Sequence, residues 1–139
     1  GDLVLLSTGR YMANQMAYVD AKTYHYHFSY VASEKVKRQP GAAHSDDIAF
    51  VMKTLDVELN NVSEKDKQIS NSMHNYWVQF AKTGDPNVPG QTHWTAYNQD
   101  NGSVLEIGDT IVLRNDFLNE RINYHINRGT DFLQSMTKQ

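Results

Sequence analysis

Hydrophobic and polar residues alternate with two different spacings along the chain. From Tyr24 to Tyr30 every second residue is a Tyr or Phe, and the residues between them are more polar. A period of two is typical of a strand with one buried face. The pattern therefore predicts a strand over 24–31. The next stretch, 32–40, is polar and basic and ends at Pro40, which indicates an exposed loop.

Four other stretches carry apolar residues at helical spacing, each preceded by a residue that can cap a helix. The predicted helices are a first one from Ser7 or Thr8 to Val19, one after Ser45, one from Ser63 to Lys82, and a last one after Asn115 or Asp116. Gly84 and Pro86 predict the end of the third helix. Gly108-Asp109, between two short apolar runs, predicts a hairpin with a type II′ turn.

Two groups of large side chains lie on single faces of these helices. Met12 and Met16 form one group, and Tyr76, Trp77 and Phe80 form the other. Helical spacing accounts for both groups as core packing without a cofactor. In the last helix, the expected inner stripe consists of Leu118, Ile122, Ile126 and Leu133. The element order is α/β in class, with too few strands for a complete sheet.

Composition and charge exclude several functional classes. The chain has 139 residues, enough for one domain or part of a larger one. A net charge of −3 is too mild to attract nucleic acid or an anionic membrane, so neither partner is expected. The apolar runs are far shorter than a membrane span. Because cysteine is absent, a disulfide scaffold, a thiolate zinc site and a cysteine nucleophile are excluded.

The first candidate for chemistry is His44, on a short loop of small residues directly before the helix that Ser45 caps. An imidazole in such a place can take a proton from a nucleophile and return it to a leaving group. A single loop histidine is also commonly structural or merely exposed. The spacing alone leaves both interpretations open.

A second candidate is the pair His25 and His27, two imidazoles on the same side of the predicted strand. Such a pair binds zinc only when a third ligand approaches, and no residue at a supporting spacing supplies one. No metal and no cofactor are expected. The chain also lacks a Gly-x-Ser-x-Gly nucleophile elbow, a phosphate-binding loop and a dinucleotide-binding glycine motif.

Several motifs in a fixed order show what the chain resembles. They are Tyr24-x-Tyr26-x-Phe28-x-Tyr30, the run from Gly41 to Val51 that contains His44, the run Phe80-Ala-Lys-Thr-Gly-Asp-Pro-Asn87, and Trp94-Thr-Ala-Tyr97. Together they resemble the carboxy-terminal part of type-B carboxylesterases, the cholinesterase-like branch of the α/β-hydrolases. The resemblance implies that the whole chain, 1–139, is the carboxy-terminal segment of one α/β-hydrolase domain.

The resemblance also implies roles for individual residues. His44 occupies the position of the triad histidine, and His25 and His27 match no functional position. The family most often has glycine after the histidine, where this chain has Ser45, which is expected to alter the local turn. The serine nucleophile and the acid of the triad precede this segment in the family.

The implied activity is hydrolysis of small carboxylic esters by a full-length serine esterase, with this segment inactive alone. The expected partners are therefore the ester substrate and either the missing amino-terminal portion or a second copy of the chain. An alternative is a non-catalytic adhesion module of the same fold that has lost the nucleophile. The absence of cysteine favours a bacterial type of enzyme over the disulfide-bearing secreted animal members.

Overall fold

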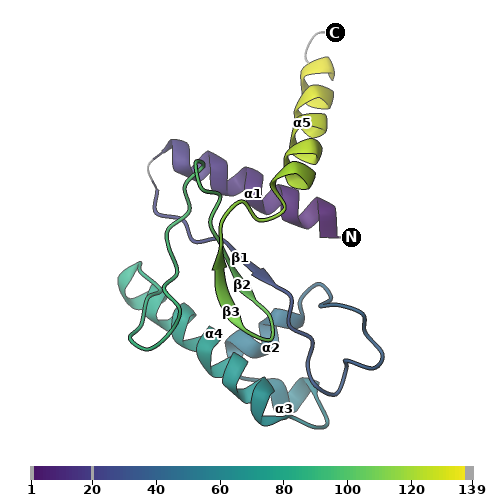
Figure 1. Ribbon diagram of the computed structural model, residues 1–139, viewed down its shortest axis with the longest axis vertical. Helices are drawn as coiled ribbons and strands as arrows, with labels where there is room; N and C mark the ends of the chain where they lie inside the picture. The colour runs from purple at the N-terminus through teal and green to yellow at the C-terminus, as the bar shows by residue number, and fades with distance from the viewer. Residues whose placement is uncertain (1, 20, 137–139) are drawn as a thin grey trace. The chain divides into compact units, whose positions relative to one another are not determined.

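The computed structural model describes residues 2–19 and 21–136, which fall into two compact units. One, here called the helical unit, comprises Gly1–His25, Thr95–Val104 and Arg114–Gln139. The other, the sheet unit, comprises Tyr26–Trp94 and Leu105–Leu113. The elements in chain order are α1 (Asp2–Tyr18), β1 (Tyr26–Phe28), α2 (Asp46–Met52), α3 (Leu55–Glu58), α4 (Glu64–Thr83), β2 (Val104–Ile107), β3 (Ile111–Arg114) and α5 (Asn119–Met136) (Figure 1).

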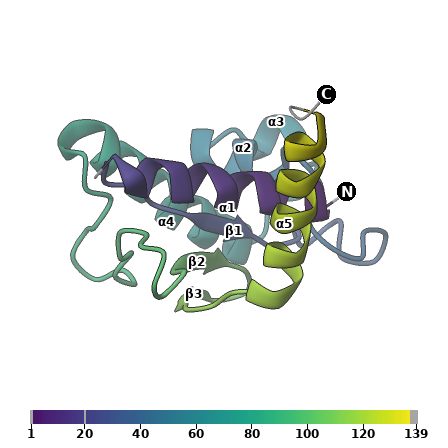
Figure 2. The same cartoon turned by 90° about the horizontal axis from the view of Figure 1, so that it is seen from above.

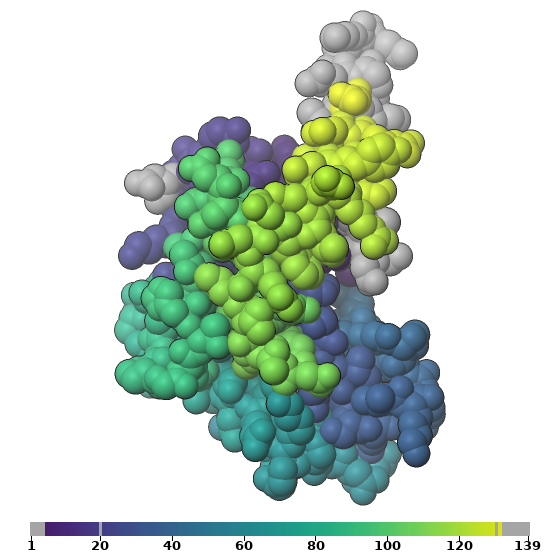
Figure 3. Space-filling model, viewed as in Figure 1, coloured from purple at the N-terminus to yellow at the C-terminus, as the bar shows by residue number. Residues whose placement is uncertain are grey.

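The sheet unit contains a three-stranded sheet in the order β1-β2-β3, which Figure 2 shows with β3 at its outer edge. β1 and β2 are parallel, with Tyr26 opposite Leu105 and Phe28 opposite Ile107. The β2–β3 hairpin, coloured green, lies on the face of this unit that is turned towards the viewer in Figure 3. Parallel pairing between strands so distant in sequence needs a long connection, which α2, α3 and α4 provide.

Aromatic side chains from β1 pack against the helices of the sheet unit. The ring of Tyr26 meets Trp77 edge to face at 4.9 Å between centroids, and Phe28 and Tyr30 both contact Phe50 of α2. Such geometry suits aromatic quadrupoles and adds to the area that is buried. The predicted aromatic face of the strand is thus confirmed for these residues of the unit.

The strand itself is shorter than the prediction of 24–31. The backbone amides of Ser29 and Tyr30 both donate to the carbonyl of Ile107, at 2.9 and 3.0 Å. Two residues opposite one mark a bulge, which ends the regular ladder after Phe28. The aromatic period of the sequence continues beyond the strand, where Tyr30 still packs on Phe50 although the pairing has stopped.

α4 begins after the predicted cap, Ser63, and ends at Thr83, one residue beyond the predicted Lys82 and directly before Gly84. The Ser63 side chain accepts from the amide of Asp66, while the Asp66 carboxylate accepts from the amide of Ser63, which forms a capping box. At the other end, Gly84 has φ 73 and closes the last turn on Phe80. Tyr76 is fully buried, but Phe80 is 45% exposed, so the prediction that it is core is wrong.

The predicted type II′ turn at Gly108-Asp109 is also wrong. That turn needs a positive φ at its first central residue, which Gly108 does not have. Three residues, 108–110, separate β2 from β3. Glycine is favoured at 108 for a different reason, because a Cβ there would lie 2.8 Å from the Ser29 hydroxyl oxygen, which would have to move.

In the helical unit, α1 and α5 contact each other, and α1 buries Arg10 and Ala13. The Arg10 guanidinium donates to the Asn119 side chain at 2.6 Å and to the Phe117 carbonyl at 3.2 Å. α1 starts at Asp2, ahead of the predicted cap.

The prediction that Met12 and Met16 are core is wrong, since they are 61% and 43% exposed. The face of α1 that packs is the one carrying Arg10, whose two terminal nitrogens donate to Asn119 and Phe117 of the same unit. The predicted contribution of Met12 and Met16 to the core rested on periodicity, which identifies an apolar face without showing which face is covered.

α5 starts later than predicted, at Asn119, because Asp116 and Leu118 have positive φ and lie outside a regular helix. Ile122 of the predicted stripe is 1% exposed, whereas Leu118 is 42% exposed. Leu133 lies outside the residues whose side chains are described. None of the helices described is long and apolar enough to cross a membrane.

Candidate active site

His44 lies in a four-residue turn that leads into α2. The amide of Asp46, the first residue of the helix, donates to the carbonyl of Ala43 at 3.2 Å and closes the turn over 43–46. Ser45 has φ 73 and ψ 1, the values of the third residue of a type II turn. His44 is therefore the second residue of this turn, at its outer corner.

The conformation of Ser45 gives a physical reason for the glycine that the family resemblance leads one to expect there. A residue with a Cβ is strained at this φ by about 1 kcal/mol, whereas glycine adopts it freely. Ser45 nevertheless keeps the turn, and its side chain makes no capping hydrogen bond to α2. The left-handed φ of Ser45 therefore predicts a strained turn where glycine would adopt the same conformation freely.

The carboxylate of Asp46 accepts hydrogen bonds from three residues that precede His44 in the chain. It accepts from the amide of Ala43 at 2.8 Å, from the side chain of Gln39 at 2.5 Å and from Lys35 at 3.1 Å. Burial raises the pKa of Asp46, but the hydrogen bonds from Ala43, Gln39 and Lys35 outweigh it and the net pKa is lowered. Asp46 is therefore held as a carboxylate beside the turn.

The rest of α2 is anchored to the sheet and to α4. Asp47 accepts from the Tyr26 hydroxyl at 2.6 Å, and burial together with this bond raises the pKa of Tyr26, so the hydroxyl stays protonated. At the other end of the helix, the hydroxyl of Ser70 donates to the Phe50 carbonyl at 2.8 Å, and His74 is 2.8 Å from the Val51 carbonyl. These bonds fix the helix that follows His44.

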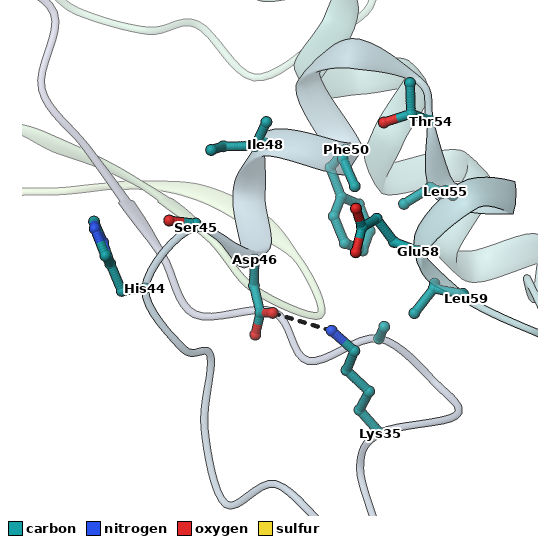
Figure 4. A pocket seen from close by; sticks show the side chains of 12 residues that line it. Lys35, His44, Ser45, Asp46, Ile48, Phe50, Thr54, Leu55, Glu58 and Leu59 are labelled. Atoms are coloured by element: carbon teal, nitrogen blue, oxygen red, sulfur yellow. Dashed lines mark hydrogen bonds and ion pairs between the residues drawn. The ribbon is translucent and has the colours of Figure 1, made fainter.

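The imidazole of His44 is exposed, and in Figure 4 it points away from the ion pair of Lys35 and Asp46. Among the described residues it has no hydrogen-bond partner. A cavity of about 330 Å³ lies beside the turn, with Phe50 and Leu55 among the apolar residues that line it. His44 thus has a fixed backbone and an imidazole available to groups outside the described residues.

Proton transfer by a histidine requires a second group that holds the ring in one tautomer. The two carboxylates nearest in sequence do not do this, since Asp46 binds Ala43, Gln39 and Lys35 and Asp47 binds Tyr26. Asp46 and Tyr26 are contributors to this region that sequence reasoning missed. The only signal was an Asp two residues after the histidine, in the first turn of a helix.

The two other candidate histidines, His25 and His27, belong to different units. Over residues 2–19 and 21–136, no group of three histidine, aspartate or glutamate side chains has the geometry to hold a metal ion. The absence of a metal site remains a prediction.

The turn that carries His44 lies between β1, which pairs in parallel with β2, and α2, whose Phe50 packs on Phe28. The carboxylesterase family matches residues 1–125, and the chain belongs to that family. This establishes the class that the family resemblance implied.

Curated relatives include esterases and lipases of animals. The chain is 35% identical over 114 residues to bile salt-activated lipase of Rattus norvegicus, covering 78% of the chain and 19% of that protein. It is 34% identical over 107 residues to carboxylesterase 5A of Canis lupus familiaris, covering 71% of the chain and 19% of that protein. The chain spans about a fifth of the length of these relatives.

Solved structures agree on the fold. A PNB esterase superposes with a TM-score of 0.64 at 26% identity, over 73% of this chain and 21% of that one. A carboxylesterase of Geobacillus stearothermophilus has the same TM-score at 25% identity, over 78% and 23%. An esterase of Clostridium hathewayi, at 22% identity, reaches a TM-score of 0.70 over 80% and 22%, which supports the fold alone.

Proposed function

We propose that this chain is the carboxy-terminal segment of a serine carboxylesterase and that His44 is the histidine of its catalytic triad. The observation that carries the proposal is the geometry of the turn over 43–46. It fixes the backbone of His44 while leaving the imidazole exposed and without a partner in the described residues. Family membership supports the reaction class.

In this role, His44 takes the proton from the nucleophilic serine as that oxygen attacks the ester carbonyl. The imidazolium then gives the proton to the departing alkoxide, which leaves as the alcohol. The acyl-enzyme is hydrolysed when the same imidazole takes a proton from the attacking water and then gives it to the serine oxygen as the carboxylic acid leaves. Each of the two half-reactions returns His44 to its neutral form, so one turnover consumes one ester and one water.

The other members of the triad come, in this proposal, from an amino-terminal portion of the same domain. The order of the triad in α/β-hydrolases is serine, acid, histidine, and His44 follows a parallel strand as the last member does. The engagement of Asp46 and Asp47 in other hydrogen bonds supports an acid from elsewhere.

The test is turnover of an aryl acetate by the complete esterase and by its His44→Gln variant. We expect kcat to fall by about a thousandfold or more, because the remaining groups give only residual catalysis. His93→Gln is the matched control, since His93 is also an exposed histidine of a loop in the sheet unit. The control is expected to keep wild-type turnover.

Near wild-type turnover by His44→Gln would overturn the proposed role. A complete protein that hydrolyses no simple ester, even at high concentration, would instead support the non-catalytic alternative. Melting temperatures of both variants are measured alongside, so that loss of the fold is not read as loss of catalysis.

A further inference from the structure

We propose that Asp46 is a positioning residue for His44, holding both ends of the turn on which the imidazole is carried. This inference rests on the proposed function, because it assigns a role within the same site. It concerns Asp46 acting through the backbone of Ala43, without contact to the substrate or to the imidazole.

The first observation is that Asp46 makes two bonds to one residue. Its amide donates to the Ala43 carbonyl at 3.2 Å, and its carboxylate accepts from the Ala43 amide at 2.8 Å. Only His44 and Ser45 lie between the two residues. Both peptide groups of Ala43 are thereby tied to the start of α2, and the His44 backbone is enclosed between them.

The second observation is that the same carboxylate restrains the chain further upstream. Gln39 donates one bond to Asp46 at 2.5 Å and another to the Gly41 carbonyl at 2.8 Å, and Lys35 pairs with the other carboxylate oxygen at 3.1 Å. The small residues at 41–43 have little packing to hold them, since 41 and 43 are exposed. The Asp46 carboxylate, which accepts hydrogen bonds from three donors, therefore restrains this stretch of backbone where packing does not.

The third observation is that Asp46 is itself well anchored. It is the first residue of α2, which Asp47 ties to Tyr26 at 2.6 Å and Ser70 ties to α4 through the Phe50 carbonyl. The turn over 43–46 is therefore held by Asp46, and Asp46 is held by the bonds of α2 to the core of the sheet unit. A displacement of about 1 Å in a catalytic group costs on the order of a hundredfold in rate, so small movements of the turn matter.

A simpler explanation must be excluded, namely that any acidic side chain at the N-terminus of α2 stabilises the helix through its dipole. Asp46 and Asp47 both lie in the first turn of α2 and both complement its dipole. Changing either one to Asn removes one charge from the same place. In Asp47→Asn the amide oxygen still accepts from Tyr26, whereas in Asp46→Asn one oxygen replaces two that served three donors.

The experiment measures kcat, KM and melting temperature in the complete esterase with an aryl acetate as substrate. For Asp46→Ala we expect kcat to fall about 10- to 100-fold with KM changed by less than threefold, because in this proposal Asp46 acts through the backbone of Ala43 and not on the substrate. For Asp46→Asn we expect a smaller fall in kcat, since the amide oxygen remains as one acceptor for the Ala43 amide. Asp47→Asn is expected to stay within threefold of wild type in kcat.

Ser63→Ala, which removes the cap of α4 outside the turn over 43–46, reports the effect of lost stability alone. The inference is overturned if Asp46→Ala keeps kcat within threefold of wild type, or if Ser63→Ala lowers kcat as much at an equal loss of melting temperature. If Asp46→Ala does not fold, Asp46→Asn against Asp47→Asn decides: equal kcat in the two overturns it. Failure of the proposed function is distinguishable, because His44→Gln would then remain active.

Discussion

The hydroxyl of Tyr30 donates to the carboxylate of Asp66 at 2.8 Å and so ties the end of the β1 segment to the first turn of α4. The same buried carboxylate accepts from the amide and hydroxyl of Ser33 and from those of Ser63. Burial and the hydrogen bond to Asp66 raise the pKa of Tyr30 to about 12, so the hydroxyl remains a donor near neutral pH. One carboxylate thus satisfies donors from three residues, two at the end of the β1 segment and one at the cap of α4.

We predict that Asp66→Asn destabilises the complete protein. An amide offers one acceptor oxygen and places an NH₂ group against donors that were satisfied before, which costs about 1–3 kcal/mol. The measurement is the free energy or midpoint of unfolding. Glu64→Gln, an exposed change in the same turn of α4, is the control and is expected to have little effect. An Asp66→Asn protein as stable as wild type would contradict this account.

The pH dependence of that difference follows from the pKa of Asp66. Burial raises the pKa, but the hydrogen bonds from Ser33, Ser63 and Tyr30 lower it by more than burial raises it. The pKa in the folded state therefore lies below the unfolded value of about 3.9. Asp66 therefore stabilises the fold above pH about 4, and this contribution is lost as the pH falls through the folded pKa. We expect the gap in melting temperature between wild type and Asp66→Asn to narrow in acid, and a constant gap would contradict it.

Ser45→Gly is expected to stabilise the protein by about 0.5–1 kcal/mol. The residue has φ 73, where a Cβ is strained and glycine is not. Glycine has more freedom in the unfolded chain, which keeps the gain small. Ser45→Ala, which keeps the Cβ, is the control and should give no gain. A rise in melting temperature for glycine alone is the expected outcome.

Gly108→Ala is expected to destabilise the sheet unit by about 1 kcal/mol, because its Cβ would meet the Ser29 hydroxyl oxygen at 2.8 Å. That hydroxyl donates to Glu106 at 3.3 Å and must leave this bond to make room. Adding Ser29→Ala removes the obstructing atom and should restore most of the loss. Additive effects of the two changes in a double-mutant cycle would show that the contact is not the cause.

The chain on its own is expected to be catalytically silent and to associate with itself or with an amino-terminal portion. In the described sheet, β1 is an end strand that pairs only with β2, and Ile48 and Met52 of α2 are 55% and 64% exposed. Strand edges and apolar surface favour pairing with other chains. Light scattering over a range of concentrations measures association, and an aryl acetate assay measures activity. A monomer with activity that depends on His44 would contradict both expectations.

The sequence was sufficient where local chemistry decides the structure. A capping serine at 63 and a glycine at 84 bracket α4 in both the pattern and the structure. The place of His44 before α2 followed from its short loop of small residues and the acidic first turn.

Other features depend on contacts between distant residues. The early end of β1 arises because Ile107 accepts from both Ser29 and Tyr30, which no local pattern encodes. The covered face of α1 is the one whose Arg10 finds acceptors at Phe117 and Asn119, roughly a hundred residues away.

The pairing of β1 with β2 also imposes an order on the folding of the sheet unit during synthesis. Tyr26 and its partner Leu105 are roughly eighty residues apart in sequence, so on the ribosome β1 waits several seconds for its neighbour to emerge. The turn over 43–46, α2 and the capping box of α4 involve closer residues and can form in the nascent chain first. The aromatic face of β1 can therefore pack on the emerging helices before the sheet exists, and β2 docks last on a surface already assembled.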